Sequence, residues 1–396
     1  MRIALDVSSA VRPEATGVAV YIRQLVGALA QVCGTTGIPA PCSLSDAEGN
    51  RPPPLERGSD GANDEFALVH RLSRIRHRAH FVKPPGPRFR IKLMAEGWHP
   101  FWGRQVDLFH GLDARLPGPW MKARLVVTIH DVFSALQSEG FATPEFRKMK
   151  AARYRDLIDR ADRIVVVSEA SRRDVLETLA PDPAKLRVIY EAAGEAFGPQ
   201  GEEAVRRVRM RHNLERPYLL YVGSINKRKN VPAMVRAFLR AREATRSEAV
   251  LALSGRVGFG GEEIKSALGL DAPRDEIRLL GYVPDADLAP LYAGAWGLLF
   301  ATRYEGFGIP VVEAFRCGCP VLGGTKGSVP EIAGGAALLA DPASEEEIAA
   351  QIGRLLGDEA LREELRAKGR TRAEAFSWTR TARETLALYR ECCGMA

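Results

Sequence analysis

Cysteine is scarce in this sequence, and its spacing suits neither a zinc site nor a disulfide framework. The chain has 396 residues, and its six cysteines are Cys33, Cys42, Cys317, Cys319, Cys392 and Cys393. No two of them form a C-x2-C pair, and Cys317-Gly-Cys319 is too short for a zinc knuckle and is followed by no histidine-rich partner. We therefore interpret these thiols as buried or incidental groups of a protein in a reducing cytoplasm.

Long apolar runs are also missing. No uninterrupted apolar stretch approaches the roughly 20 residues that a bilayer-spanning helix needs. The segment Met1 to Ala10 (MRIALDVSSA) is too short for the apolar region of a signal peptide and is typical of a first β-strand. We expect a cytoplasmic protein, in which any contact with a membrane is peripheral.

Neither sign of charge dominates. The 56 Lys and Arg residues against 49 Asp and Glu residues give a net charge of +7. This excess is too small to indicate nucleic-acid binding, and no base-reading module is recognisable, but it fits an anionic substrate or an anionic membrane surface. Hydrophobic residues make up 46% and charged residues 27%, as in globular proteins, and the length suggests two or three domains.

Short apolar segments alternate with amphipathic helical patterns in both halves of the chain, which predicts an α/β fold with parallel sheets. In the first half we expect strands at 3–7, 106–110, 125–129 and 164–167, with helices that include 19–30 and 146–160. In the second half we expect strands at 218–222, 249–254, 277–280, 297–300, 320–323 and 337–339, with helices that include 231–245 and 344–356. Glycine, proline and charged residues accumulate at 197–216, where we place the junction.

One part of the first half breaks this pattern. Residues 35–65 are rich in Gly, Pro, Ser and Asp, which is typical of a loop or a weakly ordered insertion. Residues 70–104 then carry nine Lys or Arg residues and a single acid, Glu96, with aromatic and aliphatic residues between them. Two interpretations stay open: a solvated basic face, and a docking surface for an anionic membrane or a lipid-linked phosphate.

The strongest functional signal is the segment YEGFGIPVVE, residues 304–313. It follows an expected strand and opens a helix, for which Pro310 suits the first turn. Gly306 and Gly308 let the backbone pass close to a ligand, and the free N–H groups at the start of the helix favour an anion. Glu305 lies before the helix and Glu313 inside it, so both can face one ligand.

This segment resembles the Glu-x7-Glu motif of glycosyltransferase family 4, the large retaining family with the GT-B fold. The resemblance continues in Arg316-Cys-Gly-Cys-Pro-Val321 and in Ser328-Val-Pro-Glu-Ile332, and it covers nearly the whole chain. It implies two Rossmann-like domains that face each other across a donor-binding cleft. On that basis we expect an acceptor domain over 1–200, a donor domain over 201–378, and a last helix at about 379–396 that crosses back.

The resemblance also implies roles for the residues of the motif. Glu305 would contact hydroxyls of the transferred sugar, and Glu313 would hold the ribose of the nucleotide. Gly306, Phe307, Gly308 and Ile309 would bind the donor at the helix start. A surface position for Glu313 without function is the alternative.

A second signal is the basic turn YVGSINKRKN, residues 221–230, between an expected strand and a helix. The carboxyl end of a first strand is where open α/β sheets bind ligands, and three consecutive cations there favour an anion. The turn is similar to a family segment in which Arg228 and Lys229 contact the donor diphosphate, with Ser224 in the same turn, while Lys227 has no clear role. A solvated basic turn is the alternative.

The first domain contributes weaker signals. Gly17, in the segment 12–21, is similar to the family's glycine loop, which approaches the donor phosphate. His130 ends an expected strand, and the resemblance implies that it touches the transferred sugar; His110 is placed similarly, with a core role equally open. The usual N-G-V of the family is replaced by Tyr190-Glu-Ala-Ala193, which leaves the contacts there undefined.

Three further expectations concern the ligands. Asp285-Ala-Asp287 imitates a metal-binding Asp-x-Asp motif, but it precedes a helix, where acids stabilise the N-terminus, so we expect no metal and no cofactor. The nucleobase is expected near Arg256, Tyr282 and Val283. The motif wording is most like the mannosyltransferases of bacterial cell-surface polysaccharides, which makes GDP-mannose the expected donor and a saccharide or lipid-linked molecule the expected acceptor.

Other functions stay open at this point. The same motifs serve donors such as UDP-glucose and UDP-N-acetylglucosamine, and a nucleotide-sugar epimerase can share the architecture. A non-catalytic nucleotide-sugar-binding protein is the alternative from another class.

Overall fold

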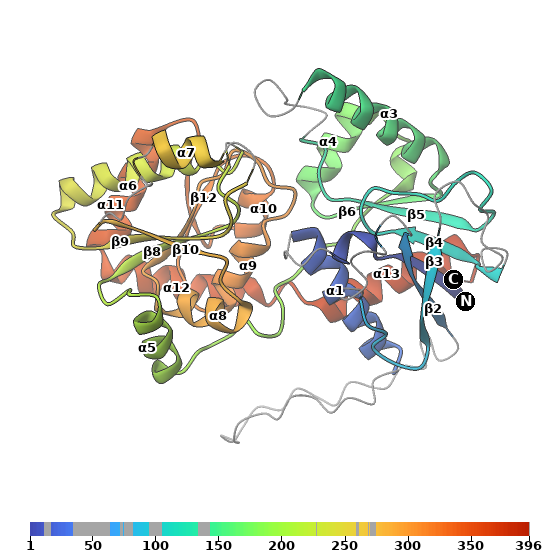
Figure 1. The fold of residues 1–396 in the computed structure, drawn as a ribbon, viewed down its shortest axis with the longest axis horizontal. Coiled ribbons are helices and arrows are strands. Elements are labelled where there is room, and N and C mark those ends of the chain that lie inside the picture. Colours follow the sequence, from blue (N-terminus) through green and yellow to red (C-terminus); the bar gives the residue numbers. More distant parts are fainter. Residues whose placement is uncertain are drawn as a thin grey trace.

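The structure is a computed structural model that describes residues 1–11, 17–34, 64–71, 74, 82–94, 105–133, 143–226, 228–258, 261–267, 269 and 275–395. These residues form two α/β lobes that lie side by side (Figure 1). Each lobe contains one sheet whose strands all run parallel. The expected two Rossmann-like domains are therefore confirmed.

The described part of the first domain contains a seven-stranded sheet in the order β3-β2-β1-β4-β5-β6-β7. Its strands are β1 (Arg2–Asp6), β2 (Glu65–Arg71), β3 (Phe89–Met94), β4 (Leu108–Gly111), β5 (Arg124–Ile129), β6 (Arg163–Val166) and β7 (Leu186–Val188). Its helices are η1 (Ser8–Val11), α1 (Gly17–Val32), α3 (Pro144–Arg160), α4 (Glu169–Leu179) and η4 (Pro183–Lys185).

The described part of the second domain contains a six-stranded sheet in the order β10-β9-β8-β11-β12-β13. Its strands are β8 (Tyr218–Val222), β9 (Val250–Ser254), β10 (Ile277–Gly281), β11 (Gly297–Phe300), β12 (Val321–Gly324) and β13 (Leu338–Ala340). The helices are α5 (Glu202–Arg211), α6 (Val231–Thr245), α7 (Gly261–Ala267), α8 (Asp285–Gly294), α9 (Ile309–Arg316), α10 (Val329–Ala333), α11 (Glu345–Gly357), α12 (Glu359–Ala373) and α13 (Trp378–Cys392).

Burial explains why these segments are strands. The central strands β8, β9 and β11 are almost wholly apolar and buried, as expected of parallel strands covered on both faces. Local signals then define helix starts: Ser344 accepts a hydrogen bond from the N–H of Glu347 at 3.1 Å, and Thr143 caps α3 in the same manner.

In the described residues, no helix has both the length and the apolar character that crossing a membrane requires.

The last helix, α13, leaves the second domain and lies against α1 of the first (Figure 1). Polar contacts hold it there: Thr381 Oγ1 donates to the carbonyl of Tyr190 at 2.7 Å, and Tyr389 Oη lies 2.6 Å from Nδ1 of His110. Glu391 of α13 also pairs with Arg163 and Arg187 of the first domain, at 2.9 and 2.7 Å. Nε2 of His110 lies 2.8 Å from Thr128 Oγ1, and burial lowers the pKa of His110 to about 3. His110 is therefore a neutral core residue that anchors α13.

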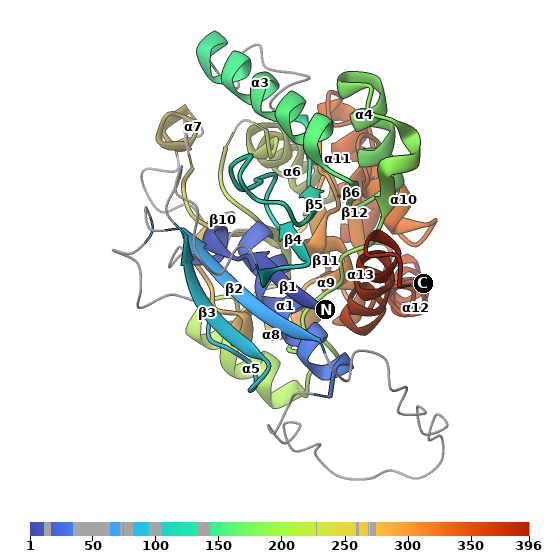
Figure 2. The same cartoon turned by 90° about the vertical axis from the view of Figure 1, so that its right-hand side faces the viewer.

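The interpretation of residues 70–104 as one basic surface is wrong for its first residues. His70 and Arg71 belong to β2, inside the sheet, and both are buried; β3 forms the sheet edge (Figure 2). Glu65 likewise starts β2 rather than ending a loop. The rest of the insertion at 35–63 and the basic residues at 76, 78 and 104 lie outside the described residues.

A buried ion pair explains why a charged residue is accepted in β2. Nε of Arg71 donates to Oδ2 of Asp6 at 2.9 Å, and the N–H of Arg71 donates to Ser8 Oγ at the same distance. Ser8 N–H in turn donates to Oδ1 of Asp6 at 3.1 Å. The carboxyl ends of β1 and β2 are thus joined by one charged network, which alternating hydrophobicity does not predict.

We expect Asp6→Asn to lower the free energy of unfolding by about 3 kcal/mol, because it removes the charge that Asp6 supplies to the buried guanidinium of Arg71. Asp107→Asn is the matched control, since Asp107 pairs with Arg2 at an exposed position and its loss should cost less than about 1 kcal/mol. Urea denaturation followed by circular dichroism measures both. Equal destabilisation by the two substitutions would contradict the assignment.

Candidate active site

The turn between β11 and α9 places the predicted glutamates. Gly308 is the N-cap of α9 with a φ of 98°, a left-handed conformation that favours glycine, and Pro310 occupies the first turn as predicted. Ser328 Oγ donates to the carbonyls of Glu305 and Phe307 at 3.0 and 2.7 Å, which fixes the turn from the α10 side. The free N–H groups of α9 therefore begin directly beside Glu305.

Gly306 lies in close contact with the first domain. A Cβ atom built on it would lie 2.0 Å from the carbonyl oxygen of His130, so no larger residue fits in this arrangement. Ser168 and Ser171, at the start of α4, both donate from Oγ to the carbonyl of Gly306, at 2.6 and 2.9 Å. Side chains of the first domain thus bind the backbone of this turn of the second domain.

Glu305 and Lys229, which come from different turns of the second domain, form a buried ion pair. Nζ of Lys229 lies 2.6 and 2.8 Å from the two carboxylate oxygens of Glu305. Burial lowers the pKa of Lys229, and the charge of Glu305 offsets only part of that effect. The structure therefore brings together the residue expected at the sugar and a residue expected at the diphosphate.

Arg228 crosses the domain interface instead. Its Nη1 donates to Oδ2 of Asp131 in the first domain at 3.1 Å, and its guanidinium lies over the ring of Phe133, 5.7 Å from the centroid. Burial lowers the pKa of Arg228, but the charges of Glu305 and Asp131 outweigh it, so the net pKa is raised. Both predicted cations thus have carboxylate partners in this state.

His130 is held at both ring nitrogens. Nδ1 lies 3.0 Å from Oε1 of Glu191, and Nε2 lies 3.0 Å from the carbonyl oxygen of Leu112. Because both partners accept, both nitrogens must donate, which is the bonding pattern of the protonated imidazolium. Burial lowers the pKa of His130, but Glu191, together with Asp113 and the carbonyl of Leu112, raises it more, and the net pKa lies above the usual value.

Glu313 is buried on α9 rather than exposed. Its Oε2 accepts a hydrogen bond from Tyr292 Oη at 3.0 Å, and burial raises its pKa to about 8. The carboxyl group is therefore mostly protonated at neutral pH in this state. A buried carboxyl group with a displaced pKa beside a helix start is typical of a functional position, although structural networks produce the same shift.

The predicted nucleobase residues lie on neighbouring turns. The Arg256 guanidinium stacks over the exposed ring of Tyr282 at 5.4 Å, whereas Val283 is buried in the core. The N–H of Gly255 donates to the carbonyl of Gly281 at 2.7 Å, which joins the turns after β9 and β10. Arg256 and Tyr282 thus form one surface at the carboxyl edge of the second sheet.

The remaining residues predicted to bind the donor are Phe307, Ile309, Ser224 and Gly17, and the structure shows fewer side chains available to a ligand among them. The side chains of Phe307 and Ile309 are buried, and Phe307 stacks edge-on with Phe376, so only their backbone can face a ligand. Ser224 Oγ accepts from Asn226 Nδ2 at 2.8 Å within the basic turn. Gly17 begins α1, while residues 12–16 of the glycine loop and Lys227 lie outside the described residues.

Several interface residues were missed in the sequence. The carboxylate of Glu331 accepts hydrogen bonds from the N–H groups of Glu169 and Ala170 and from Tyr190 Oη, at 2.8, 2.9 and 2.8 Å. It therefore caps α4 of the other domain. Glu191 was noticed only as a departure from the family pattern, and its partnership with His130 is invisible in sequence because 61 residues separate them.

Comparisons with known proteins identify the family. The profile described as "Glycosyltransferase Family 4" matches residues 15–192, and that described as "Glycosyl transferases group 1" matches residues 204–372. The O-antigen chain mannosyltransferase B of Escherichia coli is 31% identical over 289 residues, which cover 72% of this chain and 74% of that protein.

The chain belongs to glycosyltransferase family 4.

Solved structures agree on the fold of this glycosyltransferase. Anabaena Alr3699/HepE in complex with UDP and glucose aligns over 99% of this chain and 100% of its own, with a TM-score of 0.70 at 13% identity. WaaG, a glycosyltransferase involved in lipopolysaccharide biosynthesis, covers 98% of this chain and 99% of its own, with a TM-score of 0.68 at 16% identity. At these identities the likeness establishes the GT-B fold.

The Asp285-Ala-Asp287 segment of the glycosyltransferase lies in the first turn of α8, as the capping interpretation predicts. Asp287 pairs with Arg211 at 2.6 Å. Asp285 acts on Glu313, whose pKa it helps to raise. Within the described residues, no group of three or more His, Cys, Asp or Glu side chains could hold a metal ion.

We expect Glu191→Gln to lower the pKa of His130, because the neutral amide removes the charge that holds the imidazolium. An NMR titration of the histidine Cε1 protons measures the shift, and transferase activity should fall at lower pH than in the wild type. Glu195→Gln, at an exposed position, is the control. An unchanged His130 titration in Glu191→Gln would show that Glu191 does not set its protonation.

Proposed function

We propose that this glycosyltransferase moves mannose from GDP-mannose to a saccharide or lipid-linked acceptor in the synthesis of a cell-envelope polysaccharide. The transfer would retain the anomeric configuration and need no metal. The observation that carries the proposal is the meeting of Glu305, Lys229 and Arg228 with the start of α9 at the domain interface. The mannosyltransferase function of the E. coli relative supports the choice of sugar.

The arrangement would offer an anionic leaving group the positive charge that a metal ion would otherwise supply. As the bond between the sugar carbon and the phosphate oxygen breaks, negative charge grows on the diphosphate. Arg228, Lys229 and the N–H groups at the start of α9 are preorganised to stabilise that charge, which is worth several kcal/mol in a site that excludes water. The bound diphosphate would take over from Asp131 and Glu305 as partner of these cations.

A front-face reaction fits the residues. The acceptor oxygen bonds to the sugar carbon on the face that the diphosphate leaves, and the acceptor proton passes to the departing phosphate oxygen. Such a route needs no carboxylate placed as nucleophile. Glu305 and the imidazolium of His130 would then orient the sugar, and Glu313 would bind the ribose hydroxyls.

The nucleotide of the sugar donor is the part of the proposal that the structure constrains least. Arg256 and Tyr282 offer a stacking surface that suits any base, so a UDP-sugar is the alternative donor. The HepE complex, with UDP and glucose, is a structural neighbour that favours this alternative. A non-catalytic nucleotide-sugar-binding protein would have the same residues but no turnover.

A panel of nucleotide sugars tests the proposal. GDP-mannose should raise the melting temperature more than UDP-glucose, UDP-N-acetylglucosamine or GDP alone, and it alone should be hydrolysed or transferred at a substantial rate. NMR of the product should show the anomeric configuration of the donor, and EDTA should leave the rate unchanged. Turnover that EDTA abolishes and manganese restores would contradict metal independence, and stabilisation without any turnover would favour the non-catalytic alternative.

Kinetics of three variants should separate the roles at the site. Lys229→Ala should lower kcat by roughly 10²-fold or more, because it removes a charge that acts in the transition state. Glu313→Ala should mainly raise KM for the donor, since the ribose is remote from the reacting bond. Glu305→Ala should lower kcat and change donor preference together. A wild-type kcat in Lys229→Ala, with no turnover in Glu313→Ala at saturating donor, would overturn these roles.

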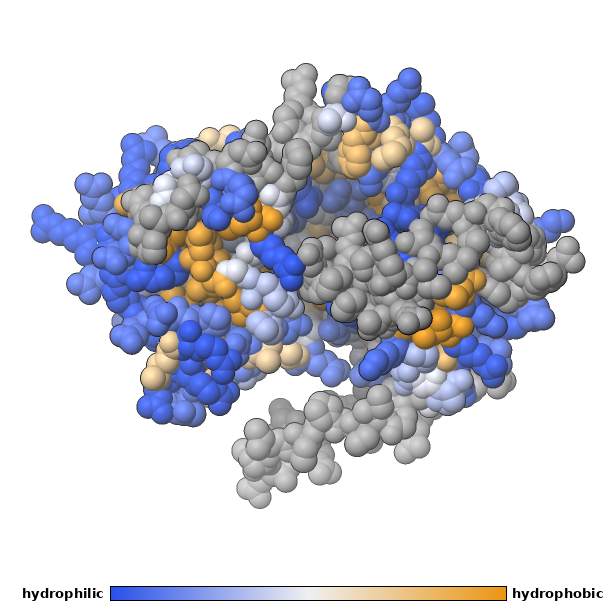
Figure 3. Space-filling view, viewed as in Figure 1, coloured by the Kyte–Doolittle hydropathy of each residue, from blue (hydrophilic) through white to orange (hydrophobic). Residues whose placement is uncertain are grey.

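A cytoplasmic location with peripheral membrane association is part of the proposal. Ile91 and Leu93 are exposed on the edge strand β3, where they alternate with Arg90 and Lys92. Apolar residues lie among hydrophilic ones on this lobe (Figure 3). Such mixing of basic and apolar side chains is typical of surfaces that contact anionic lipids. Sedimentation with acidic vesicles at low and high salt tests it, and binding that does not weaken with salt would speak against it.

A further inference from the structure

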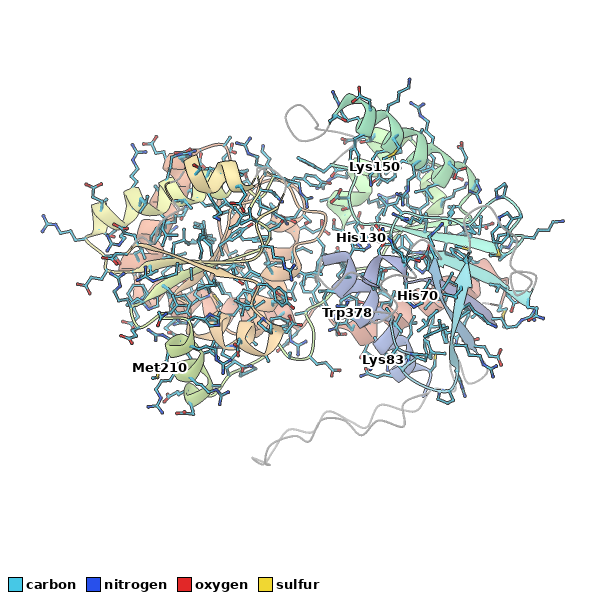
Figure 4. All side chains as sticks on the ribbon, in the orientation of Figure 1. His70, Lys83, His130, Lys150, Met210 and Trp378 are labelled. Atoms are coloured by element: carbon cyan, nitrogen blue, oxygen red, sulfur yellow. The ribbon has the colours of Figure 1, made fainter. Side chains whose placement is uncertain are left out.

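Three cations gather on the first domain beside the active site, and the proposed reaction gives none of them a role. Arg115 lies on the turn that follows β4, and Lys150 and Arg153 lie on α3. We call them the α3 cation cluster. Lys150 is placed under α3 and above His130 on the same lobe (Figure 4).

Hydrogen bonds place the cluster at the carboxyl ends of β4 and β5. Nε of Arg153 donates to the carbonyl of Ala114 at 2.8 Å, and its Nη2 donates to the carbonyl of Asp113 at 3.1 Å. One residue further along α3, Tyr154 Oη donates to the carbonyl of Asp131 at 2.9 Å. The helix therefore lies on the two turns that also carry Leu112 and His130.

Within the described part of the chain, no carboxylate forms an ion pair with any of the three cations of the cluster. Among the described residues, the buried Nε of Arg115 has no hydrogen-bond partner, and the partners of Arg153 are backbone carbonyls. Lys150 is half buried and contacts the ring of Phe146 at 5.6 Å, with no carboxylate among the described residues within ion-pair distance. Uncompensated charges that are partly removed from water are costly, which favours an anion at this place.

The neighbouring acids are engaged elsewhere. Asp131 pairs with Arg228, and Asp113 accepts a hydrogen bond from Ser9 Oγ. Burial lowers the pKa of Lys150, and the charge of Arg153 lowers it further, against smaller opposite effects of Asp113 and Asp131. Burial and the charge of Arg115 lower the pKa of Arg153 in the same way. The three cations are thus close enough to repel one another.

The cluster is continuous with the donor site but separate from it. Asp131 lies between them, since it binds Arg228 on one side and acts on Lys150 on the other. The donor cations belong to the second domain, whereas the cluster belongs to the first, on the side from which an acceptor must approach. An anion bound here would therefore sit next to the acceptor hydroxyl rather than on the nucleotide.

We propose that the α3 cation cluster binds a phosphate group of the acceptor, so that the acceptor of this enzyme is a phosphate-bearing molecule. Arginine offers the planar pair of donors that matches phosphate, and the ammonium of Lys150 adds a point charge. The inference rests on the proposed transferase function and specifies its acceptor. The phosphate belongs either to a sugar phosphate or to a diphosphate-linked lipid.

Two measurements test the cluster. The first titrates inorganic phosphate into protein whose donor site is filled with saturating GDP, using calorimetry on the wild type, Arg115→Gln and Lys150→Gln. The second compares KM for octyl mannoside, mannose 1-phosphate and mannose linked through a diphosphate to a lipid. Lys148→Gln, which removes a lysine from the exposed face of the same helix, is the matched control.

We expect each cluster variant to weaken phosphate binding and to raise KM for the charged acceptors by about tenfold, equivalent to ~1.4 kcal/mol. KM for octyl mannoside and for the donor should stay unchanged, and Lys148→Gln should behave as wild type. A higher KM for both charged acceptors would show that the cluster binds the phosphate group itself. A higher KM for the lipid diphosphate alone would show that the cluster binds a lipid-linked acceptor.

Stability separates binding from a structural role. Because the cations repel one another, Arg115→Gln and Lys150→Gln should not lower the melting temperature of the free protein. Arg115→Lys, which keeps the charge but loses the paired donors, is a further variant for the same measurements. The proposal would be overturned if the variants raised KM for octyl mannoside as much as for the charged acceptors. It would also be overturned if neither variant weakened the binding of phosphate. If no nucleotide sugar is turned over, the proposed function fails, while the phosphate titration still decides the inference.

Discussion

The contact between the backbone of Gly306 and the carbonyl of His130 is the constraint on which the rest of the interface depends. There is no room for a Cβ atom at Gly306, and its carbonyl is held by two serine hydroxyls of the other domain. That approach brings Glu305 to the side of the first domain and lets Arg228 reach Asp131. A glycine is therefore required here by the meeting of two domains, not by the conformation of its own turn.

Charge pairing makes this interface stable before a substrate is bound. Buried cations without partners would be costly, and Lys229 and Arg228 are each given a carboxylate, one within the second domain and one across the interface. The proposed diphosphate would compete with those carboxylates for the same two cations. Of these two pairs, Arg228–Asp131 joins the two domains, whereas Lys229–Glu305 lies within the second domain.

The two sides of the site differ in this respect. Arg228 and Lys229 are paired with acids. In the described part of the first domain, Nε of Arg115 is buried without a hydrogen-bond partner, and Arg153 donates to backbone carbonyls. The imidazolium of His130, fixed by Glu191 and Leu112, lies between these two regions. The side proposed for the donor and the side proposed for the acceptor thus differ in charge pairing, and Asp131 interacts with cations of both.

The sequence by itself determined the α/β class, most strands of both sheets, the helix start at Pro310 and the family, because these depend on local hydrophobic patterns and on contiguous motifs. It also placed Glu305, Arg228 and Lys229 in plausible turns. Only the tertiary structure decided that β2 runs inside the sheet with Arg71 paired to Asp6, and that Glu191 holds His130. Those pairings join residues 65 and 61 positions apart, and no local pattern encodes them, because each charge is stabilised by a partner that only folding brings near.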